Sequence, residues 1–389
     1  MGEDGLVGLT DASRKALAAA EFVFGGPRHL ALAGIARPKA QEWPLPFSVA
    51  PVLALRGRRV AVLASGDPFW FGAGGSLMPH LAPQEWQSFP MPSTFALAAN
   101  HLGWRLEDTR CFGLHAAPFA MLRPCLIKGA RLICLLRGGE APAELATWLT
   151  DQGAGASTLH LLEALGGPRA RYRTTRADRF DITECAPPVA MAVEVSASVG
   201  LPNSAGLPED SFCHDGQITK SPIRALTLSA LAPRRGELLW DIGAGSGSVS
   251  VEWCLAGGRA LALEPRSDRL ANINQNIARF GLAQQMQAVE GAVSGGKLPQ
   301  TLADSGPPDA VFIGGGGDAA LLETLFATMP KATRLVMNAV TLETEALLVL
   351  WQALKGGSLM RVELAHASPL GKMRGWSPTR AVVQWSVLL

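Results

Sequence analysis

Residues 238–254 read LLWDIGAGSGSVSVEWC, and this stretch decides the fold of the second half of the chain. Its first three residues are apolar and predict a buried strand that ends at Asp241, after which Gly243–Gly247 predicts a tight turn into a helix. A strand, a glycine turn and a helix bring backbone N–H groups close to a nucleotide-like ligand. The next apolar run, Ala260–Leu263, ends in Glu264, where a second strand would aim a carboxylate at ribose hydroxyls.

The acidic residue before the glycines bears on the identity of the ligand. Asp241 lies two residues before Gly243, and the glycine spacing is GxGxG rather than GxGxxG. A carboxylate there repels a pyrophosphate but suits a ligand that carries an ammonium and a sulfonium group. The pattern favours S-adenosyl-L-methionine over a dinucleotide. A turn or helix-capping role for Asp241, and a dehydrogenase site at the glycines, remain as alternatives.

Length, charge and cysteine content narrow the class of protein. The 389 residues are enough for two domains with separate cores, and a net charge of +2 gives no sign of binding to nucleic acid or a membrane surface. The six cysteines form no CxxC pair, so we expect reduced thiols and no metal site. Without a signal-peptide pattern or an apolar run of about 18 residues, we expect a soluble, cytoplasmic protein.

The first half alternates strand-like and helical segments, which predicts α/β layers. We expect helices at 13–20, 95–102 and 143–149, and strands at 21–24, 59–64, 85–89, 131–136, 157–161 and 187–195. Ser65-Gly66-Asp67 follows the strand at 59–64, a position where open α/β sheets bind ligands, although Gly66-Asp67-Pro68 fits an ordinary turn equally well. Residues 196–209 are rich in Ser, Gly and Pro and predict a linker.

The second half predicts five strand–helix units followed by a pair of strands. We expect helices at 223–231, after the glycine turn, and at 267–280 and 342–354, and strands at 238–241, 259–263, 286–289, 310–313, 335–338, 358–365 and 379–387. This order matches a seven-stranded methyltransferase sheet, in which the last hairpin inserts an antiparallel strand.

With both halves laid out, the chain resembles the fused precorrin-6Y C(5,15)-methyltransferases (decarboxylating) of cobalamin biosynthesis. The resemblance covers nearly all of the chain and rests on Val62–Gly74, Pro92–Thr94, Leu162–Pro168, Gly216–Lys220, Asp241–Gly247, Glu264, Gly291-Ala292, Val311–Gly315 and Asn338–Thr344. It implies an α/β protein with a two-lobed tetrapyrrole-methylase domain over residues 1–195. After the linker at 196–209, it implies a Rossmann-like class I methyltransferase domain with a seven-stranded mixed sheet over residues 210–389.

The beginning of the chain departs from the pattern of that family. Its members usually begin with a short strand that ends in a glycine-rich turn of the form VVGIGxDG. Here only Met1–Gly5 corresponds to the turn, and no strand precedes it. Either the start codon is assigned late or one sheet strand is missing, and we expect the first sheet to be perturbed or incomplete.

The resemblance also implies a reaction. Each domain would bind one S-adenosyl-L-methionine; the first would methylate C5 of precorrin-6Y, and the second would methylate C15 and remove the carboxyl group of the C12 acetate, giving precorrin-8X. Such catalysis is mostly positioning, and no catalytic triad is recognisable. We expect a homo-oligomer. The alternatives are a methyltransferase for another substrate with only the C-terminal domain active, and a corrinoid carrier without turnover.

The resemblance assigns site residues motif by motif. The C-terminal cofactor would contact Thr219, Asp241, Gly243, Ala244, Gly245, Ser246, Gly247, Glu264 and Ala292, and the N-terminal cofactor would contact Ser65, Gly66, Asp67, Trp70, Phe95 and Ala96. Gly314, Gly315 and Asn338 would face the macrocycle. Because the implied substrate is rich in carboxylates, basic residues near the cleft are candidate partners for it, although any single one of them fits a solvated surface charge better: Lys220, Arg224, Lys372, Arg374 and Arg380. We expect Lys372 and Arg374 to lie in a loop able to close on the ligand.

Overall fold

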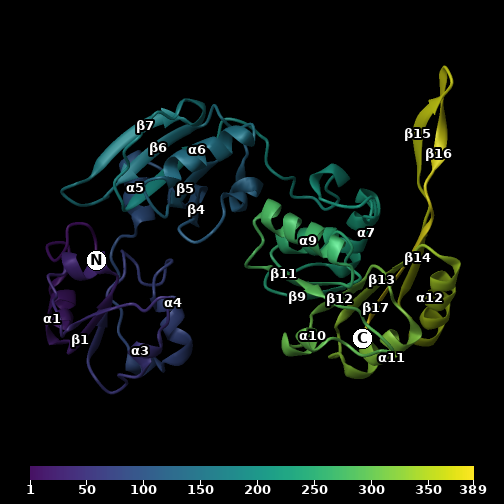
Figure 1. Ribbon diagram of the computed structural model, residues 1–389, viewed down its shortest axis with the longest axis horizontal. Helices are drawn as coiled ribbons and strands as arrows, with labels where there is room; N and C mark the ends of the chain where they lie inside the picture. The colour runs from purple at the N-terminus through teal and green to yellow at the C-terminus, as the bar shows by residue number, and fades with distance from the viewer. The chain divides into compact units, whose positions relative to one another are not determined.

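The computed structural model describes residues 1–389, which divide into two compact units, Met1–Leu201 and Pro202–Leu389 (Figure 1). The division falls within the stretch 196–209, whose composition predicts a linker. No helix is long and apolar enough to cross a membrane.

The first unit begins with a small lobe built on a parallel sheet of three strands, in the order β2-β1-β3. Its elements are α1 Asp11–Ala19, β1 Phe22–Gly25, α2 Pro27–Leu32, β2 Ala40–Glu42, α3 Ala50–Leu53, β3 Val60–Val62 and α4 Gly74–Leu77, with short 3-10 helices at Met78–His80 and Pro83–Glu85. Residues 1–6 contain no strand, since turns begin at Glu3, and the amino group of Met1 donates to the carbonyl of Ala64, 2.9 Å away.

The strand expected at 59–64 is present as β3, which is short and only half-buried because it lies at an edge of the small sheet. A second expectation for this lobe is wrong. Residues 85–89 form no strand; a 3-10 helix ends at Glu85, and the irregular segment that follows contains Pro90 and Pro92. Proline has no N–H to give to a strand ladder, which accounts for the absence of pairing.

The second lobe of this unit carries a mixed five-stranded sheet in the order β4-β5-β8-β6-β7. Its elements are α5 Thr94–Leu102, β4 Thr109–Gly113, β5 Arg131–Leu135, α6 Ala141–Asp151, β6 Thr158–Glu163, β7 Arg171–Arg176 and β8 Val189–Glu194, with 3-10 helices at Leu106–Asp108, Phe119–Cys125 and Ala177–Arg179. The apolar strands β5 and β8 are almost wholly buried between α5 on one face and α6 on the other.

The second unit is built on a seven-stranded sheet in the order β11-β10-β9-β12-β13-β17-β14, in which β17 runs antiparallel to both of its neighbours. Its elements are α7 Ser221–Leu231, β9 Leu238–Ile242, α8 Ser248–Leu255, β10 Arg259–Glu264, α9 Ser267–Phe280, β11 Met286–Glu290, α10 Gln300–Asp304, β12 Ala310–Ile313, α11 Ala319–Thr328, β13 Arg334–Ala339, α12 Leu342–Lys355, β14 Ser358–Val362 and β17 Val382–Leu388, after a 3-10 helix at Glu209–Ser211. The predicted methyltransferase sheet is confirmed.

The central strand of this sheet divides its side chains between two faces. Leu238, Trp240 and Ile242 pack in the core cluster that includes the leucines of α11. Side chains alternate along a strand, so Asp241 faces the opposite side, where it meets Ser250 of α8. The chain runs outward from β9 through β10 to β11 and then crosses to β12. The carboxyl ends of β9 and β12 therefore form the switch point at which such sheets bind ligands.

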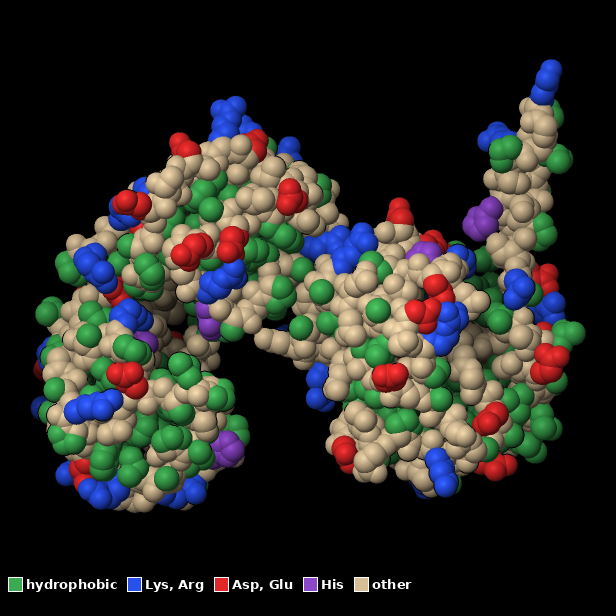
Figure 2. Space-filling model, viewed as in Figure 1, with side chains coloured by type: hydrophobic (Ala, Val, Ile, Leu, Met, Phe, Trp, Pro, Cys, Tyr) green, Lys and Arg blue, Asp and Glu red, His purple; other side chains and the backbone are tan.

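A separate hairpin follows β14, with strands β15 Ala365–Leu370 and β16 Met373–Pro378 (Figure 1). The expected mobile loop at Lys372–Trp376 is wrong, since these residues form the turn and second strand of this hairpin. Leu370, Met373 and Trp376 of the hairpin are 69%, 76% and 78% exposed. Figure 2 shows hydrophobic side chains along this hairpin.

Candidate functional site

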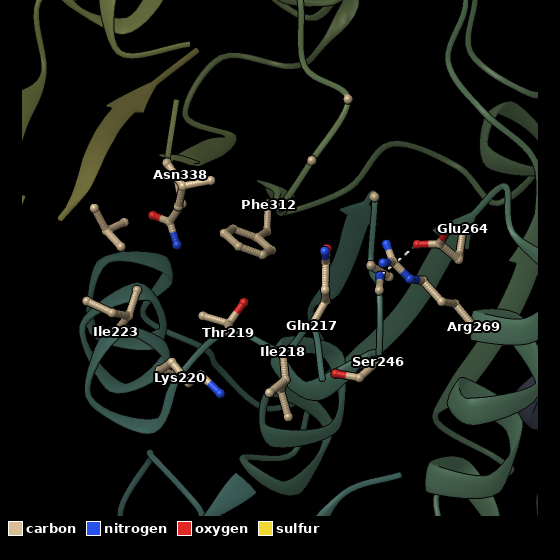
Figure 3. A pocket seen from close by; sticks show the side chains of 18 of the residues that line it. Gln217, Ile218, Thr219, Lys220, Ile223, Ser246, Glu264, Arg269, Phe312 and Asn338 are labelled. Atoms are coloured by element: carbon tan, nitrogen blue, oxygen red, sulfur yellow. Dashed lines mark hydrogen bonds between the residues drawn. The ribbon is translucent and has the colours of Figure 1, made fainter. Parts of the chain in front are cut away.

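A cavity of ≈ 1040 Å³ opens at the switch point of the second unit (Figure 3). Its walls come from the segment 216–223, the turn after β9, the end of β10, the residues after β11 and β12, and the ends of β13 and β17. The predicted residues that line it are Thr219, Lys220, Gly243, Ala244, Gly245, Ser246, Glu264, Ala292, Gly314, Gly315 and Asn338. Segments far apart in the sequence thus form one site.

The three glycines after β9 have different structural roles. Gly243 has a φ of +70°, and a Cβ there would lie 2.3 Å from the carbonyl oxygen of Gly315, so the two loops can meet only without a side chain. Gly245 has a φ of +60°, and a Cβ there would meet only the carbonyl oxygen of Gln217, at 4.0 Å. Gly247 does not line the cavity; a Cβ on it would lie 2.9 Å from Cε of Met286, so this glycine allows helix packing.

Glu264 ends β10 at the cavity wall and is only 3% exposed. Its Oε2 accepts a hydrogen bond from the N–H of Gly245 at 2.8 Å (Figure 3). Its Oε1 accepts from the N–H of Arg266 at 3.2 Å. The carboxylate therefore fixes the glycine turn while it lies at the edge of the cavity. Arg269, which also lines the wall, is held by Asp215 at 2.9 Å.

Asp241 lies beneath the glycine turn and does not line the cavity. It is 1% exposed; Oδ2 accepts from the Ser250 hydroxyl at 2.6 Å, and Oδ1 has no partner. Burial raises the pKa of Asp241 to about 7, against the opposing hydrogen bond from Ser250, and the charge of Glu264 adds to the rise. A buried carboxylate with an unpaired oxygen is stabilised as an anion by a cationic ligand nearby.

These features fit S-adenosyl-L-methionine. The space beside Gly245 admits a ligand against the backbone, and Glu264 is placed at the end of the second strand as ribose recognition requires. The unpartnered Oδ1 of Asp241 supplies negative charge near that turn. A pyrophosphate would instead meet two acidic side chains.

The prediction of Arg224 as a substrate partner is wrong. Arg224 is fully buried, its Nε donates to Glu252 at 2.6 Å, and it also donates to the carbonyls of Thr219 and Leu207. Glu252 accepts in addition from the N–H groups of Gly206 and Leu207. The pair fastens the segment that forms one wall of the cavity to the helices behind it.

The far end of the cavity combines neutral and cationic side chains. Asn338 lies there with Lys220, Arg380 and His366. Lys372 and Arg374, in the turn and second strand of the hairpin, do not line the cavity. Arg380 follows the hairpin and, like His366 of β15, lines the wall.

Sequence reasoning missed several lining residues, namely Gln217, Arg266, Arg269, Phe312 and His366. Arg266 and Arg269 follow Glu264 by two and five residues, a spacing that puts both at the first turn of the next helix. Their position just after Glu264, the predicted ribose-binding acid, could have indicated that both arginines line the site. Nothing local distinguished Phe312 from a core residue, because it lies within an apolar strand.

The predicted cofactor residues of the first unit gather at the start of α5. The turn after β3 contacts this helix closely, since a Cβ on Gly66 would lie 2.6 Å from Cα of Ser93. The ring of Trp70 lies 5.0 Å from that of Phe95, which is itself buried in the core. The N–H of Ala96 is capped by the Ser93 hydroxyl.

Two polar residues of that turn already have partners within the chain. Asp67 accepts from the N–H of Phe69 at 2.8 Å. The Ser65 hydroxyl is bonded by Arg28 at 2.7 Å and by the ring of His29 at 2.8 Å. Burial, followed by the charge of Arg28, lowers the pKa of His29 to about 4, so this imidazole is neutral at physiological pH.

The seven-stranded sheet, the glycine turn after its central strand and the acid ending the next strand define an S-adenosyl-L-methionine-dependent class I methyltransferase. Two family models match the chain: Tetrapyrrole (Corrin/Porphyrin) Methylases over residues 2–181 and Precorrin methyltransferase domain over residues 210–389.

Relatives match the chain over its whole length. A precorrin-6Y C(5,15)-methyltransferase [decarboxylating] of Sinorhizobium sp is 45% identical over 99% of this chain and 94% of its own. One of Mycobacterium tuberculosis (strain CDC 1551 / Oshkosh) is 38% identical over 100% and 98%. The crystal structure of the C-terminal domain of that enzyme from Rhodobacter capsulatus has 58% sequence identity over 49% of this chain and 100% of its own, with a TM-score of 0.46. The chain belongs to the precorrin-6Y C(5,15)-methyltransferase (decarboxylating) family.

Proposed function

We propose that the protein methylates precorrin-6Y at C5 and C15 and removes the carboxyl group of the C12 acetate, giving precorrin-8X, with one S-adenosyl-L-methionine bound in each domain. The observation that carries the C-terminal half of this proposal is the single cavity that joins the glycine turn and Glu264 to a far end lined by Asn338, Lys220 and Arg380. A methyl donor and a carboxylate-rich acceptor fit the two ends of such a cavity.

The chain itself contributes mainly positioning. S-adenosyl-L-methionine, when bound, supplies an electrophilic methyl group on a sulfonium. Glu264 would hold the adenosine end, beside the turn that it fixes by accepting from the N–H of Gly245, and the charge of Asp241 favours the cationic end. The side chains of Ile223, Phe312 and Val382 form an apolar wall that excludes water from the site of transfer.

Lys220 and Arg380 are the side chains proposed to bind the acidic substituents of the tetrapyrrole. Both line the cavity, where the charge of Lys220 also interacts with Glu209. An arginine binds a carboxylate in a fixed bidentate geometry, whereas a lysine acts as a point charge. Arg380 would therefore set the orientation of the macrocycle, and Lys220 would add affinity.

The C5 methylation is assigned to the first unit on the strength of its match to the tetrapyrrole methylases. A second candidate, in which only the C-terminal domain turns over, is favoured by two observations. The first sheet has three strands, and the hydroxyl of Ser65 is already engaged by Arg28 and His29.

We propose also that the protein is a homo-oligomer. The hairpin carries Leu370, Met373 and Trp376 largely in solvent, and apolar side chains on a projecting arm are stabilised by contact with another chain. Size-exclusion chromatography with light scattering tests this: a mass of one chain at micromolar concentration would contradict it.

The reaction is tested by incubating the purified chain with precorrin-6Y and S-adenosyl-L-methionine, followed by mass spectrometry of the product. The proposal expects the gain of two methyl groups and the loss of carbon dioxide. A product with one methyl group and loss of carbon dioxide would instead support the second candidate, and an unchanged substrate would refute both.

A further inference from the structure

Three uncharged polar side chains from three separate elements bond to one another at the far end of the cavity. Asn338 of β13 donates through Nδ2 to the hydroxyl of Thr227 on α7, at 2.9 Å. Gln384 of β17 donates through Nε2 to that same hydroxyl and to Oδ1 of Asn338, each at 3.0 Å. Asn338 and Gln384 are directly opposite across the antiparallel pair. We refer to the three residues as the polar triad.

The triad leaves one donor directed to the cavity. Thr227 and Gln384 are buried, at 0% and 4% exposure, whereas Asn338 is half-buried and lines the cavity. Its amide has two N–H groups; one bonds to Thr227, and the other has no partner within the chain. Because Thr227 and Gln384 bond to both ends of the amide, its rotation is fixed. An oriented N–H without a partner is suited to an acceptor on a bound molecule.

Two of the side chains that border the space around this amide, Phe312 and Ile223, are apolar. Figure 3 shows the Asn338 amide directed to the space that Phe312, Ile223 and Thr219 also border. Ile223 lies one helical turn before Thr227, so both face the same side. No charged side chain is hydrogen-bonded to the triad.

We propose that the free N–H of Asn338 binds the substrate carboxylate that leaves as carbon dioxide, and that Thr227 and Gln384 are positioning residues for this amide. The proposal rests on the proposed function and adds the residue that handles its decarboxylation. In that step the bond between the carboxylate carbon and the methylene carbon breaks, and the electron pair passes into the conjugated ring. A proton from water then converts the methylene into a methyl group.

A neutral donor suits this step better than an arginine. An ion pair with the leaving carboxylate would stabilise the ground state more than the transition state, in which the negative charge has moved to the ring. A fixed neutral amide orients the carboxylate with less ground-state stabilisation than a cation would give. Lys220 and Arg380 remain available for the acidic substituents that stay on the product.

The test uses the full chain with saturating precorrin-6Y and S-adenosyl-L-methionine, and measures carbon dioxide release and S-adenosylhomocysteine affinity separately. Asn338→Leu keeps the side-chain volume and removes the N–H. It should lower the rate of release at saturation by roughly 10- to 100-fold, because the carboxylate is no longer held in the orientation in which its bond to the methylene carbon breaks into the ring. The affinity of this variant for S-adenosylhomocysteine should stay within about twofold of wild type, because Asn338 does not lie at the end of the cavity that would hold the cofactor.

Thr227→Val gives an independent variant that leaves Asn338 in place but frees its amide to rotate. We expect an intermediate loss of release rate, with recovery in Thr227→Ser, which keeps the hydroxyl. Thr324→Val on α11 is the matched control, because its hydroxyl bonds only to Ala320 of its own helix, and it should release carbon dioxide at the wild-type rate.

Three results would overturn the assignment. The first is carbon dioxide release by Asn338→Leu at the wild-type rate. The second is a rise of KM in Asn338→Leu without a fall of kcat, and the third is a loss of its affinity for S-adenosylhomocysteine in parallel with the loss of release. A wild-type protein that neither releases carbon dioxide nor transfers a methyl group would instead refute the proposed function itself. Unfolding curves of each variant separate a local effect from a loss of the fold.

Discussion

The buried pair Arg224–Glu252 supports a prediction in which stability and ligand binding change together. The guanidinium is fully buried and the Glu252 side chain is 4% exposed, with Nε and Oε1 2.6 Å apart. Arg224→Met keeps much of the side-chain length and removes the charge. Glu252 would then remain buried with only the N–H groups of Gly206 and Leu207 as donors.

The expected magnitude follows from that geometry. Removing one member of a buried ion pair costs about 3–5 kcal/mol, because the other charge is left without its partner. Arg224 also holds the carbonyls of Thr219 and Leu207, so its loss frees the segment that forms a wall of the cavity. We therefore expect the affinity for S-adenosylhomocysteine to fall by roughly 10-fold as well, an energetic coupling of about 1.4 kcal/mol.

The assay is urea unfolding followed by tryptophan fluorescence, together with calorimetric titration of S-adenosylhomocysteine. The double variant Arg224→Met/Glu252→Gln should lose less than the sum of the two single variants, since it leaves no buried charge unpaired. Arg361→Met is the control within the same unit, because its ion pairs with Glu345 and Glu363 are exposed and should contribute less than about 1 kcal/mol. If the free energy of unfolding of Arg224→Met lies within about 1 kcal/mol of the wild-type value, Arg224 and Glu252 do not form a stabilising buried ion pair.

Three further predictions concern the cofactor end. Since burial raises the pKa of Asp241 from 3.8 to about 7, the folded protein binds a proton that the unfolded chain releases between these values, so stability should fall as pH rises through this window. Urea unfolding at several pH values should show this fall in wild type but not in Asp241→Asn. The affinity of the wild-type protein for the cationic S-adenosyl-L-methionine should rise with pH. A wild-type stability that does not change with pH would contradict the raised pKa of Asp241. Gly243→Ala should lower the free energy of unfolding by more than about 2 kcal/mol, because its Cβ meets the carbonyl of Gly315. Gly245→Ala should lower the free energy of unfolding by about 1 kcal/mol and mainly weaken ligand binding. Equal melting curves for the two variants would show that the turn after β9 and the loop after β12 do not meet. Glu264→Gln keeps the shape but loses the charge, and calorimetry should show at least about 10-fold weaker binding of S-adenosylhomocysteine; an unchanged dissociation constant would remove Glu264 from the site.

Much of the C-terminal fold could be predicted because its signals are local. The apolar run before Asp241 and the glycines after it specify a strand and a turn with little dependence on the rest of the chain. Together with Glu264, they also locate the cofactor end of the cavity. The position of a ligand at the switch point follows from the order of strands, which the alternation of elements already indicates.

The hairpin could not be predicted from its pattern. Its strands contain Pro369 and Gly375, and both faces are exposed, so no alternation of apolar and polar residues marks them. Likewise, β7 (Arg171–Arg176) is polar at nearly every position, because it is an edge strand. Such segments resemble loops in sequence.

The misassignment of Arg224 and the omission of the polar triad have a common cause. An arginine near a predicted cleft looks like a ligand partner until its tertiary neighbours are known, and Glu252 lies 28 residues further along the chain. Thr227 and Gln384 are 157 residues apart and meet only through the packing of a helix on two strands. Contacts of that kind are specified by the whole fold and not by local spacing.

Calorimetric titration of the purified chain with S-adenosylhomocysteine tests the central claim most directly, because it counts cofactor sites. Two sites per chain are expected, one of which is lost in Gly245→Ala while the other persists. A single site in wild type would contradict the assignment of a working cofactor site to the first unit, and the absence of any binding would contradict the methyltransferase account as a whole.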